Sequence, residues 1–358
     1  MHRPFKSVYQ RFVMDKLDYK RYLFVSGVLS VVLLVSVAAF NYFIDPYNLM
    51  GNNWTGVYFW NERQLKGREI LNYDHQAVLI GSSKTGYVNP DDLECYRFYN
   101  ASMRGMVPEE IYFFLKKYLR NEKLVLVGFD FYMFNEREFP LITIKDWDDV
   151  AYNPLEYLLG ISTLKMSKKT LKHWKNHDPI FRMHENGQFD YPGSKGKPLP
   201  ARTRQEKKKY RDIINGLVEH HYGDFVLSRQ RMEYVRKLKE LFENREIPYA
   251  VFINPLSSDV LAALRHVDAY PVFLKWRKDM RTIFPNIYDF SSGPYSDPKL
   301  FHSDDPYHYT NEAGKEFLNR IIRDFCENKQ ADGCFIKPRF SDCNEYGALT
   351  CKCMVSLR

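Results

Sequence analysis

Residues 76–85 read QAVLIGSSKT, a short apolar run that ends in a glycine, two serines and a lysine. The run is continuously apolar rather than alternating, which is typical of a strand covered on both faces of a parallel sheet. Four further runs of strand character lie at residues 96–100 (YRFYN), 123–128 (KLVLVG), 249–254 (YAVFIN) and 287–290 (IYDF). The chain is therefore expected to fold as an α/β domain around a parallel sheet.

Helical stretches separate these runs. Residues 108–120 begin with a proline and two acidic residues and end in lysine and arginine, which matches helix polarity. Residues 228–244 and 311–326 have apolar residues on one face, with Ser228 and Asn311 as the expected N-caps. Alternation of strands and helices favours a parallel sheet. Between residues 135 and 225 the pattern lapses, and we expect an insertion at about 136–225 over one end of the sheet.

The inserted region carries a cluster of basic residues. A stretch rich in glycine, proline and lysine at residues 191–200 runs into QEKKK at residues 205–209. Charge runs of this kind are usually solvated loops, and contact with an anionic polymer is the alternative. The sequence leaves both interpretations open.

One segment near the N-terminus is not typical of a soluble protein. Residues 22–43 carry no charge, and about 20 apolar residues are enough to span a bilayer. Residues 1–21 hold six basic and two acidic residues, and basic flanks stay cytoplasmic. A cleaved signal peptide is the alternative, but the run is long and no small-residue cleavage site precedes Asp45. We therefore expect a cytoplasmic tail, a single span of the cytoplasmic membrane, a connector at 44–70 and an extracytoplasmic domain.

Composition narrows the class of partner. The 358 residues include 52 Lys and Arg against 44 Asp and Glu, a net charge of +8. Half of that excess, +4, lies in residues 1–21, where it orients the membrane span. The remainder is a mild bias, and the sequence contains no nucleic-acid-binding motif. A nucleic acid is therefore not an expected partner, whereas an anionic polymer or lipid surface fits.

Five of the six cysteines crowd the C-terminus. They are Cys326, Cys334, Cys343, Cys351 and Cys353, whereas Cys95 stands alone. In an oxidising compartment this distribution predicts disulfides that staple a tail at 326–358, with the pairing left open. Zinc binding is the weaker interpretation, because the last pair is C-x-C and no histidine follows residue 308. No metal or other cofactor is expected.

Ser83 is the first candidate for chemistry. It directly follows a predicted strand, and the carboxyl ends of parallel strands are where α/β sheets bind ligands. A nucleophile elbow would need glycine where Thr85 stands, and a P-loop would need glycine in place of Ser83. A simple turn at the end of the strand is the alternative.

The second candidate is the pair Asp305 and His308, three residues apart in an expected loop that Pro306 stiffens. That spacing lets the carboxylate reach the imidazole, fix its tautomer and stabilise the imidazolium. The other ring nitrogen can then take a proton from a serine hydroxyl. Alternatively, Asp305 caps a turn, or these two residues hold a cation together with His302 and Asp304.

Together, the early G-x-S and the D-x-x-H before the last helix resemble the SGNH/GDSL hydrolase superfamily over residues 71–325. The resemblance implies a three-layer α/β/α, flavodoxin-like domain with Ser83 as nucleophile and Asp305 and His308 as its partners. It also implies an oxyanion site near Asn100 and Gly105, from the segment NASMRG.

The third family motif departs from the pattern. The family has G-x-N-D, whereas this chain has GFDF at residues 128–131, so Asp130 replaces the oxyanion-binding asparagine. An ionised carboxylate there would repel the developing charge, and losing one such donor costs about 10²–10³ in rate. Three readings stay open: Asp130 is protonated, another donor such as Asn135 substitutes, or activity is weak or absent.

The overall layout is similar to membrane-anchored SGNH-like proteins of alginate acetylation and lipoteichoic-acid D-alanylation. That resemblance implies acyl transfer to, or removal from, a surface polysaccharide or other envelope polymer, beside a multi-spanning membrane-bound O-acyltransferase. The alternative is a non-catalytic glycan-binding or scaffold subunit of such a system.

Overall fold

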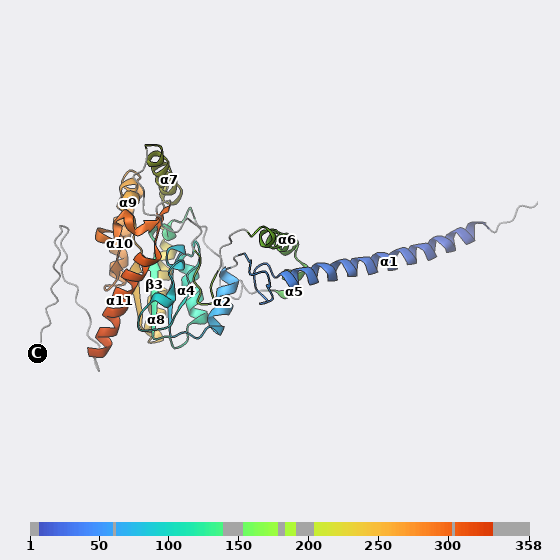
Figure 1. The fold of residues 1–358 in the computed structure, drawn as a ribbon, viewed down its shortest axis with the longest axis horizontal. Coiled ribbons are helices and arrows are strands. Elements are labelled where there is room, and N and C mark those ends of the chain that lie inside the picture. Colours follow the sequence, from blue (N-terminus) through green and yellow to red (C-terminus); the bar gives the residue numbers. More distant parts are fainter. Residues whose placement is uncertain are drawn as a thin grey trace, which may run out of the picture.

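The computed structural model describes residues 7–59, 62–138, 153–177, 183–190, 204–302 and 305–331. Helix α1 (Ser7–Ile44) projects from the folded domain as a single long rod (Figure 1). Its segment Tyr19–Ile44 is long and apolar enough to cross a membrane, and the most apolar stretch of it is not buried inside the fold. Only the end of the segment is buried, at Asn41 and Ile44. The predicted apolar span at 22–43 therefore lies within one continuous helix.

The domain is built on five parallel strands, which match the five predicted runs. They are β1 (Ala77–Ile80), β2 (Phe98–Asn100), β3 (Leu124–Phe129), β4 (Tyr249–Ile253) and β5 (Tyr288–Asp289). Their order in the sheet is β2-β1-β3-β4-β5. Connections from β1 and β3 therefore leave toward opposite edges, which opens a crevice at the carboxyl ends of these two strands.

Helices cover both faces of the sheet, which explains why the strands are continuously apolar. Val78 and Val125 pack on the face covered by α4 (Pro108–Tyr118), α8 (Arg229–Asn244), α9 (Ser258–Leu264) and α10 (Ala269–Ile283). Leu79 and Leu126 pack on the opposite face, against α11 (Asn311–Ala331). The two resulting apolar clusters form the core.

The caps show one prediction that is right and one that is wrong. The hydroxyl of Ser228 accepts a hydrogen bond from the amide of Arg231 at 3.5 Å, as expected of the N-cap of α8. The predicted cap Asn311 is instead the first residue of α11, and Thr310 Oγ1 accepts from the amide of Ala313. Asn311 is unavailable as a cap because its side chain binds the amide of Asn89.

The inserted residues differ from the expected single unit over one end of the sheet. They form α5 (Pro154–Leu159), α6 (Ile161–Asn176) and α7 (Arg204–Tyr222). Helices α5 and α6 pack against the end of α1, away from the sheet, whereas α7 packs against α9 (Figure 1). The periodicity of the sequence did not predict that the inserted helices divide into two groups, because it does not show that α5 and α6 pack against α1.

The connector at 44–70 is ordered by its own polar contacts. The buried carboxylate of Asp45 accepts hydrogen bonds from the amides of Leu49 and Met50, both at 2.9 Å. It also accepts from the hydroxyl of Tyr157 on α5 at 2.7 Å. Helix α2 (Glu62–Asn72) then leads into β1. These residues therefore join α1, α5 and the sheet domain.

Several predictions fall outside the described ranges. The basic stretch at 191–200 and the candidate ligand Asp304 lie outside them. Of the cysteines in the predicted disulfides, only Cys95 and Cys326 lie within them. Within the described ranges, Cys95 is exposed and no disulfide is formed.

Candidate active site

Ser83 begins the short helix α3 (Ser83–Gly86), directly beyond the carboxyl end of β1. The preceding residue, Ser82, caps this turn by accepting a hydrogen bond from the amide of Lys84 at 3.1 Å. Gly81 is required at the bend, because a Cβ there would lie 2.8 Å from the carbonyl oxygen of Gly128 on β3. The close approach of β1 and β3 thus sets the position of the serine.

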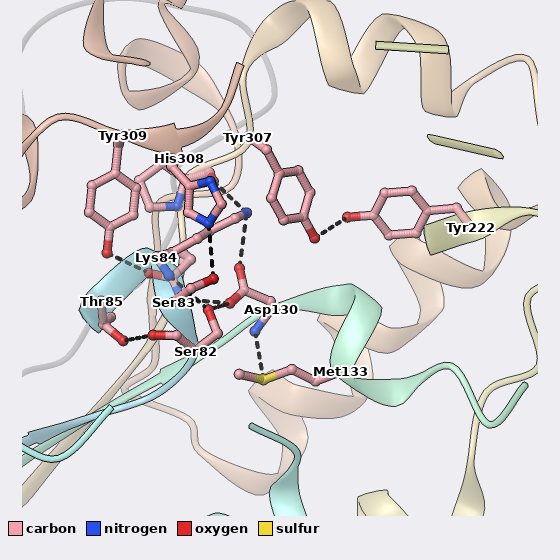
Figure 2. A network of polar contacts seen from close by, with 12 residues as sticks. Ser82, Ser83, Lys84, Thr85, Asp130, Met133, Tyr222, Tyr307, His308 and Tyr309 are labelled. Carbon is pink, nitrogen blue, oxygen red and sulfur yellow. Dashed lines mark hydrogen bonds and ion pairs between the residues drawn. The ribbon is translucent and has the colours of Figure 1, made fainter. Parts of the chain in front are cut away.

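The two candidates that are far apart in the sequence meet at this point. Ser83 Oγ lies 2.9 Å from His308 Nε2, although the residues are 225 positions apart (Figure 2). His308 Nδ1 lies 2.6 Å from Asp305 Oδ2. The carboxylate selects the tautomer with hydrogen on Nδ1, which leaves Nε2 to accept the serine proton. The three side chains form a hydrogen-bonded serine–histidine–aspartate relay, an arrangement that would allow a base to activate a hydroxyl.

The relay is carried by a short hairpin rather than by the expected loop. Strand β7 (Asp305–Tyr309) pairs with β6 (Phe301–His302) in antiparallel fashion. The second oxygen of Asp305 accepts hydrogen bonds from the amides of Tyr307 at 3.0 Å and His308 at 3.3 Å. The carboxylate is thereby fixed at both oxygens, which holds the imidazole toward Ser83.

A cavity of about 470 Å³ opens over this relay. Ser83, Asp305 and His308 line it, together with Gly105 and residues of α7. The α7 wall contributes the apolar side chains Ile213 and Leu217. The hydroxyl of Ser83 therefore faces a partly apolar space large enough for a small molecule or part of a larger one.

Asp130 does not line this cavity. It is 2% exposed and makes a 3.0 Å ion pair with Lys84, which is itself fully buried. Its Oδ2 also accepts hydrogen bonds from Ser82 Oγ at 2.6 Å and Asn254 Nδ2 at 3.1 Å (Figure 2). The negative charge expected to oppose an oxyanion is compensated by Lys84 and tied to the turn that carries Ser83.

The ammonium group of Lys84 has further partners. Its Nζ lies 4.1 Å from the ring centroid of Tyr307, a cation–π contact, and donates to the carbonyl of Pro255 at 3.3 Å. Tyr309 completes the network by donating its hydroxyl to Asn254 Oδ1 at 3.0 Å. The antiparallel strands β6 and β7, which carry His308, are thus attached to the buried pair of Lys84 and Asp130 that supports the turn at Ser83. Sequence reasoning missed this role because Lys84 followed no recognised motif.

Asn100 supports the segment that follows Ser83 through buried hydrogen bonds. Its buried amide nitrogen donates to the carbonyls of Thr85 at 2.8 Å and Val88 at 2.9 Å, and its oxygen accepts from the amide of Ser102. Asn100 therefore holds the segment after Ser83 and does not line the cavity. The alternative donor Asn135 is 1% exposed and donates to the carbonyl of His221, so its amide group is also directed away.

Gly105 is the predicted oxyanion residue that does line the cavity. Its φ of 59° lies in the left-handed region, which glycine adopts at little cost. The adjacent residue, Arg104, is held by Glu62 of α2, which accepts from its backbone amide at 2.6 Å and from its side chain. The connector helix therefore fixes the turn at Gly105, a contact that the sequence did not predict.

A second buried lysine lies close to the same turn. Lys66 of α2 is fully buried and donates to the carbonyls of Asn100 at 2.6 Å and Gly187 at 2.7 Å. Burial lowers its pKa well below the usual value for lysine. Together with Glu62, it ties α2 to the segment that contains Asn100 and Gly105.

A polar cluster lies on the α7 side of the cavity. The side chains of Glu138, His220 and His221 place ligand atoms within 4.8 Å of one another, which is the spacing of a group able to hold a metal ion. His221 Nδ1 is hydrogen-bonded to Glu138, and its ring stacks on Tyr307 with centroids 4.9 Å apart. Sequence reasoning missed the cluster because Glu138 and the histidines are far apart in the chain.

Several buried tyrosines lie near the relay, and two of them, Tyr132 and Tyr307, line the cavity. Burial raises the pKa of Tyr132, Tyr222 and Tyr307 above the ordinary value for a phenol. The hydroxyls of Tyr222 and Tyr307 are 3.5 Å apart (Figure 2). Burial also raises the pKa of Tyr87, whose ring packs edge-on against His308, to about 12. These phenols therefore stay neutral at physiological pH.

No protein-family model matches this chain, and no curated protein matches it.

Proposed function

We propose that this chain is a membrane-anchored serine O-acyltransferase or esterase that acts on a bacterial surface polysaccharide or other envelope polymer. The observation that carries the proposal is the contact of Ser83 with His308, which is in turn held by Asp305, at the carboxyl end of β1. Nucleophilic acyl transfer needs a hydroxyl, a base within hydrogen-bond reach and a group that orients the base.

The reaction follows from this geometry. Ser83 Oγ attacks the carbonyl carbon of an acyl donor while its proton passes to His308 Nε2. The imidazolium, stabilised by Asp305, then protonates the leaving group, and the acyl group stays on the serine as an ester. An acceptor hydroxyl, deprotonated by His308, attacks that ester. As the ester bond to Ser83 breaks, His308 returns the proton to Ser83 Oγ, which restores the free enzyme. A sugar hydroxyl as acceptor makes the protein a transferase, and water makes it an esterase.

We assign the oxyanion site to the backbone amides of Ser83 and Gly105. Ser83 begins α3, and Gly105 lines the same cavity on a turn held by Glu62. Backbone donors fixed before the reaction stabilise developing charge without reorganisation. In this assignment neither Asn100 nor Asp130 contacts the oxyanion, and both act by positioning the turns that do.

The strand order supports a flavodoxin-like, three-layer domain of the SGNH type. An order of 2-1-3-4-5 is that of flavodoxin-like doubly wound sheets, whose ligands bind at the switch point between the first and third strands. Ser83 follows the first strand and Asp130 the third. The proposed site thus occupies the crevice that this topology creates.

The end of α1 supports a retained membrane anchor over a cleaved signal peptide. Asn41 and Asp45 are fully buried, and Asn41 Nδ2 donates to the carbonyl of Leu158 on α5 at 2.8 Å. Cleavage in this region would remove or expose groups on which the connector depends. We propose a cytoplasmic N-terminus, a periplasmic or extracytoplasmic domain, and a multi-spanning O-acyltransferase as a membrane partner.

The alternative function, a non-catalytic glycan-binding or scaffold subunit, had Asp130 as its main support. The ion pair with Lys84 weakens that support, because the carboxylate is compensated and lies behind the serine turn. The relay itself favours catalysis.

A fluorophosphonate probe tests the catalytic proposal on the detergent-solubilised full chain. We expect labelling at Ser83, none in Ser83→Ala, and loss of labelling in His308→Ala, because the hydroxyl then has no base. Ser162→Ala, which removes an exposed serine of α6, is the matched control and should label normally. An unlabelled wild-type protein, together with unchanged envelope acylation in cells that carry Ser83→Ala, would refute the proposal and favour the scaffold function.

A second assay separates transfer from hydrolysis. The protein is incubated with a radiolabelled acetyl ester, with and without purified envelope polysaccharide. Label on the polymer identifies a transferase, whereas free acetate that is independent of polymer identifies an esterase.

A further inference from the structure

Helices α5 and α6 form a compact unit beside the end of the membrane helix. We call residues 153–176 the juxtamembrane hairpin. Its position is set by Asn41 of α1, which donates to the carbonyl of Leu158 at 2.8 Å and accepts from the hydroxyl of Ser167 at 2.9 Å. Asn41 lies three residues before Ile44, about 4.5 Å along the helix axis. The turn between α5 and α6 is therefore level with the last turn of α1.

The hairpin exposes large apolar side chains at that level. Leu155 is 70% exposed, Ile161 71% and Leu159 40%, although Thr163, Ser167 and Thr170 of the same hairpin are buried. Leaving such side chains in water forgoes the favourable transfer free energy that each gains on burial. Helix α1 is also apolar at this level, because its residue Phe43 is 64% exposed. The exposed apolar side chains of the hairpin therefore lie at the same level as an exposed apolar part of α1.

The hairpin also carries positive charge and tryptophan. Residues 153–176 contain five lysines, at positions 165, 168, 169, 172 and 175, against the single acid Glu156. Trp174 is 43% exposed and lies edge-on against Trp54 of the connector, with centroids 5.0 Å apart. Exposed leucine and isoleucine, a lysine-rich helix and interfacial tryptophan are the features of helices that lie in a membrane interface.

We propose that the juxtamembrane hairpin lies in the outer interface of the bilayer that α1 crosses, with anionic phospholipid headgroups bound to the lysines of α6. This inference rests on the membrane anchor of the proposed function and deepens it. A single spanning helix leaves a domain free to tilt, whereas a second contact at the interface fixes its orientation and the height of the Ser83 cavity above the lipid.

Photo-crosslinking in lipid nanodiscs tests the proposal. The full chain is reconstituted in phosphatidylcholine and phosphatidylglycerol, with a benzophenone amino acid at position 155 or 161. Position 274 on α10 is the matched control, since Leu274 is also apolar and 45% exposed but belongs to the sheet domain. Position 29, within α1, reports the anchor. Lipid adducts are expected at 29, 155 and 161, several-fold above those at 274, and enriched in phosphatidylglycerol.

Each other outcome decides a specific point. Adducts at 29 but none at 155 or 161 would overturn the interfacial placement and leave the anchor intact. No adducts at 29 would refute the anchor itself, whereas fluorophosphonate labelling of Ser83 would still report the enzyme. Adducts at 155 and 161 without enrichment of phosphatidylglycerol would refute the role of the lysines. In native membranes, crosslinks from 155 and 161 to another protein in place of lipid would assign this surface to a protein partner.

Discussion

Lys84 and Asp130 are buried side by side under the proposed nucleophile. Each charge would be costly to bury alone, and each is stabilised by the other together with neutral hydrogen bonds from Ser82 and Asn254. The pair links the turn after β1 to the end of β3. Position 130 thus accommodates a buried aspartate because Lys84 supplies the compensating partner.

Removal of one partner tests this pairing. Lys84→Met should destabilise the protein by about 3–5 kcal/mol, because it leaves a buried carboxylate without its cation. The double variant Lys84→Met/Asp130→Asn should recover part of that loss. Thermal unfolding of the solubilised full chain measures both, with Lys278→Met as an exposed-lysine control. Equal unfolding temperatures for Lys84→Met and the control would show that the pair does not support the fold.

At the scale of the elements, helices α2 and α7 matter most for the shape of the site. Helix α2 fixes the turn at Gly105 through Glu62 and holds Asn100 through Lys66. Helix α7 forms one wall of the cavity. The hairpin α5–α6, by contrast, is attached to α1 through Asn41 and should behave as a separate cooperative unit.

Asn41→Ala should therefore loosen the hairpin and leave the sheet unchanged. The substitution leaves the carbonyl of Leu158 and the hydroxyl of Ser167 without this partner, at a cost of about 1–3 kcal/mol for the buried Ser167 hydroxyl and less for the partly buried carbonyl. Hydrogen exchange should accelerate at residues 154–176 and stay constant in β1 and β3. Ser36→Ala is the control, since Ser36 bonds only to Val32 of its own helix. Unchanged exchange at 154–176 would show that other contacts hold the hairpin.

At the scale of the whole molecule, the fold buries phenols around the site. The pKa values of Tyr132, Tyr222, Tyr307 and Tyr309 are all raised by burial. A raised pKa means that the folded state favours the protonated phenol. Below about pH 10 both folded and unfolded chains keep that proton, so these groups add no pH dependence. At higher pH the unfolded chain releases protons first, and stability falls.

We therefore expect the unfolding temperature to decline steeply above about pH 10. The part of the tyrosine absorbance that comes from the buried phenols should rise together with unfolding, as a second step after the ionisation of solvent-exposed tyrosines. Thermal unfolding followed across the alkaline range, with tyrosine absorbance read in parallel, measures both. Full ionisation of all tyrosines in a chain that stays folded would contradict the burial of these side chains.

Local sequence determined the five strands, helices α4, α8 and α11, and the apolar span within α1, because each depends on periodicity or on an uncharged run of sufficient length. It also indicated Ser83, Asp305 and His308 as candidate residues, because the end of a predicted strand and a short spacing between polar residues can be recognised in the sequence. Tertiary structure alone decided that Ser83 and His308 meet, that Lys84 compensates Asp130, and that α5–α6 packs on α1. Such contacts join residues far apart in the chain, and only the order of strands and the packing of helices bring those residues within a few ångströms.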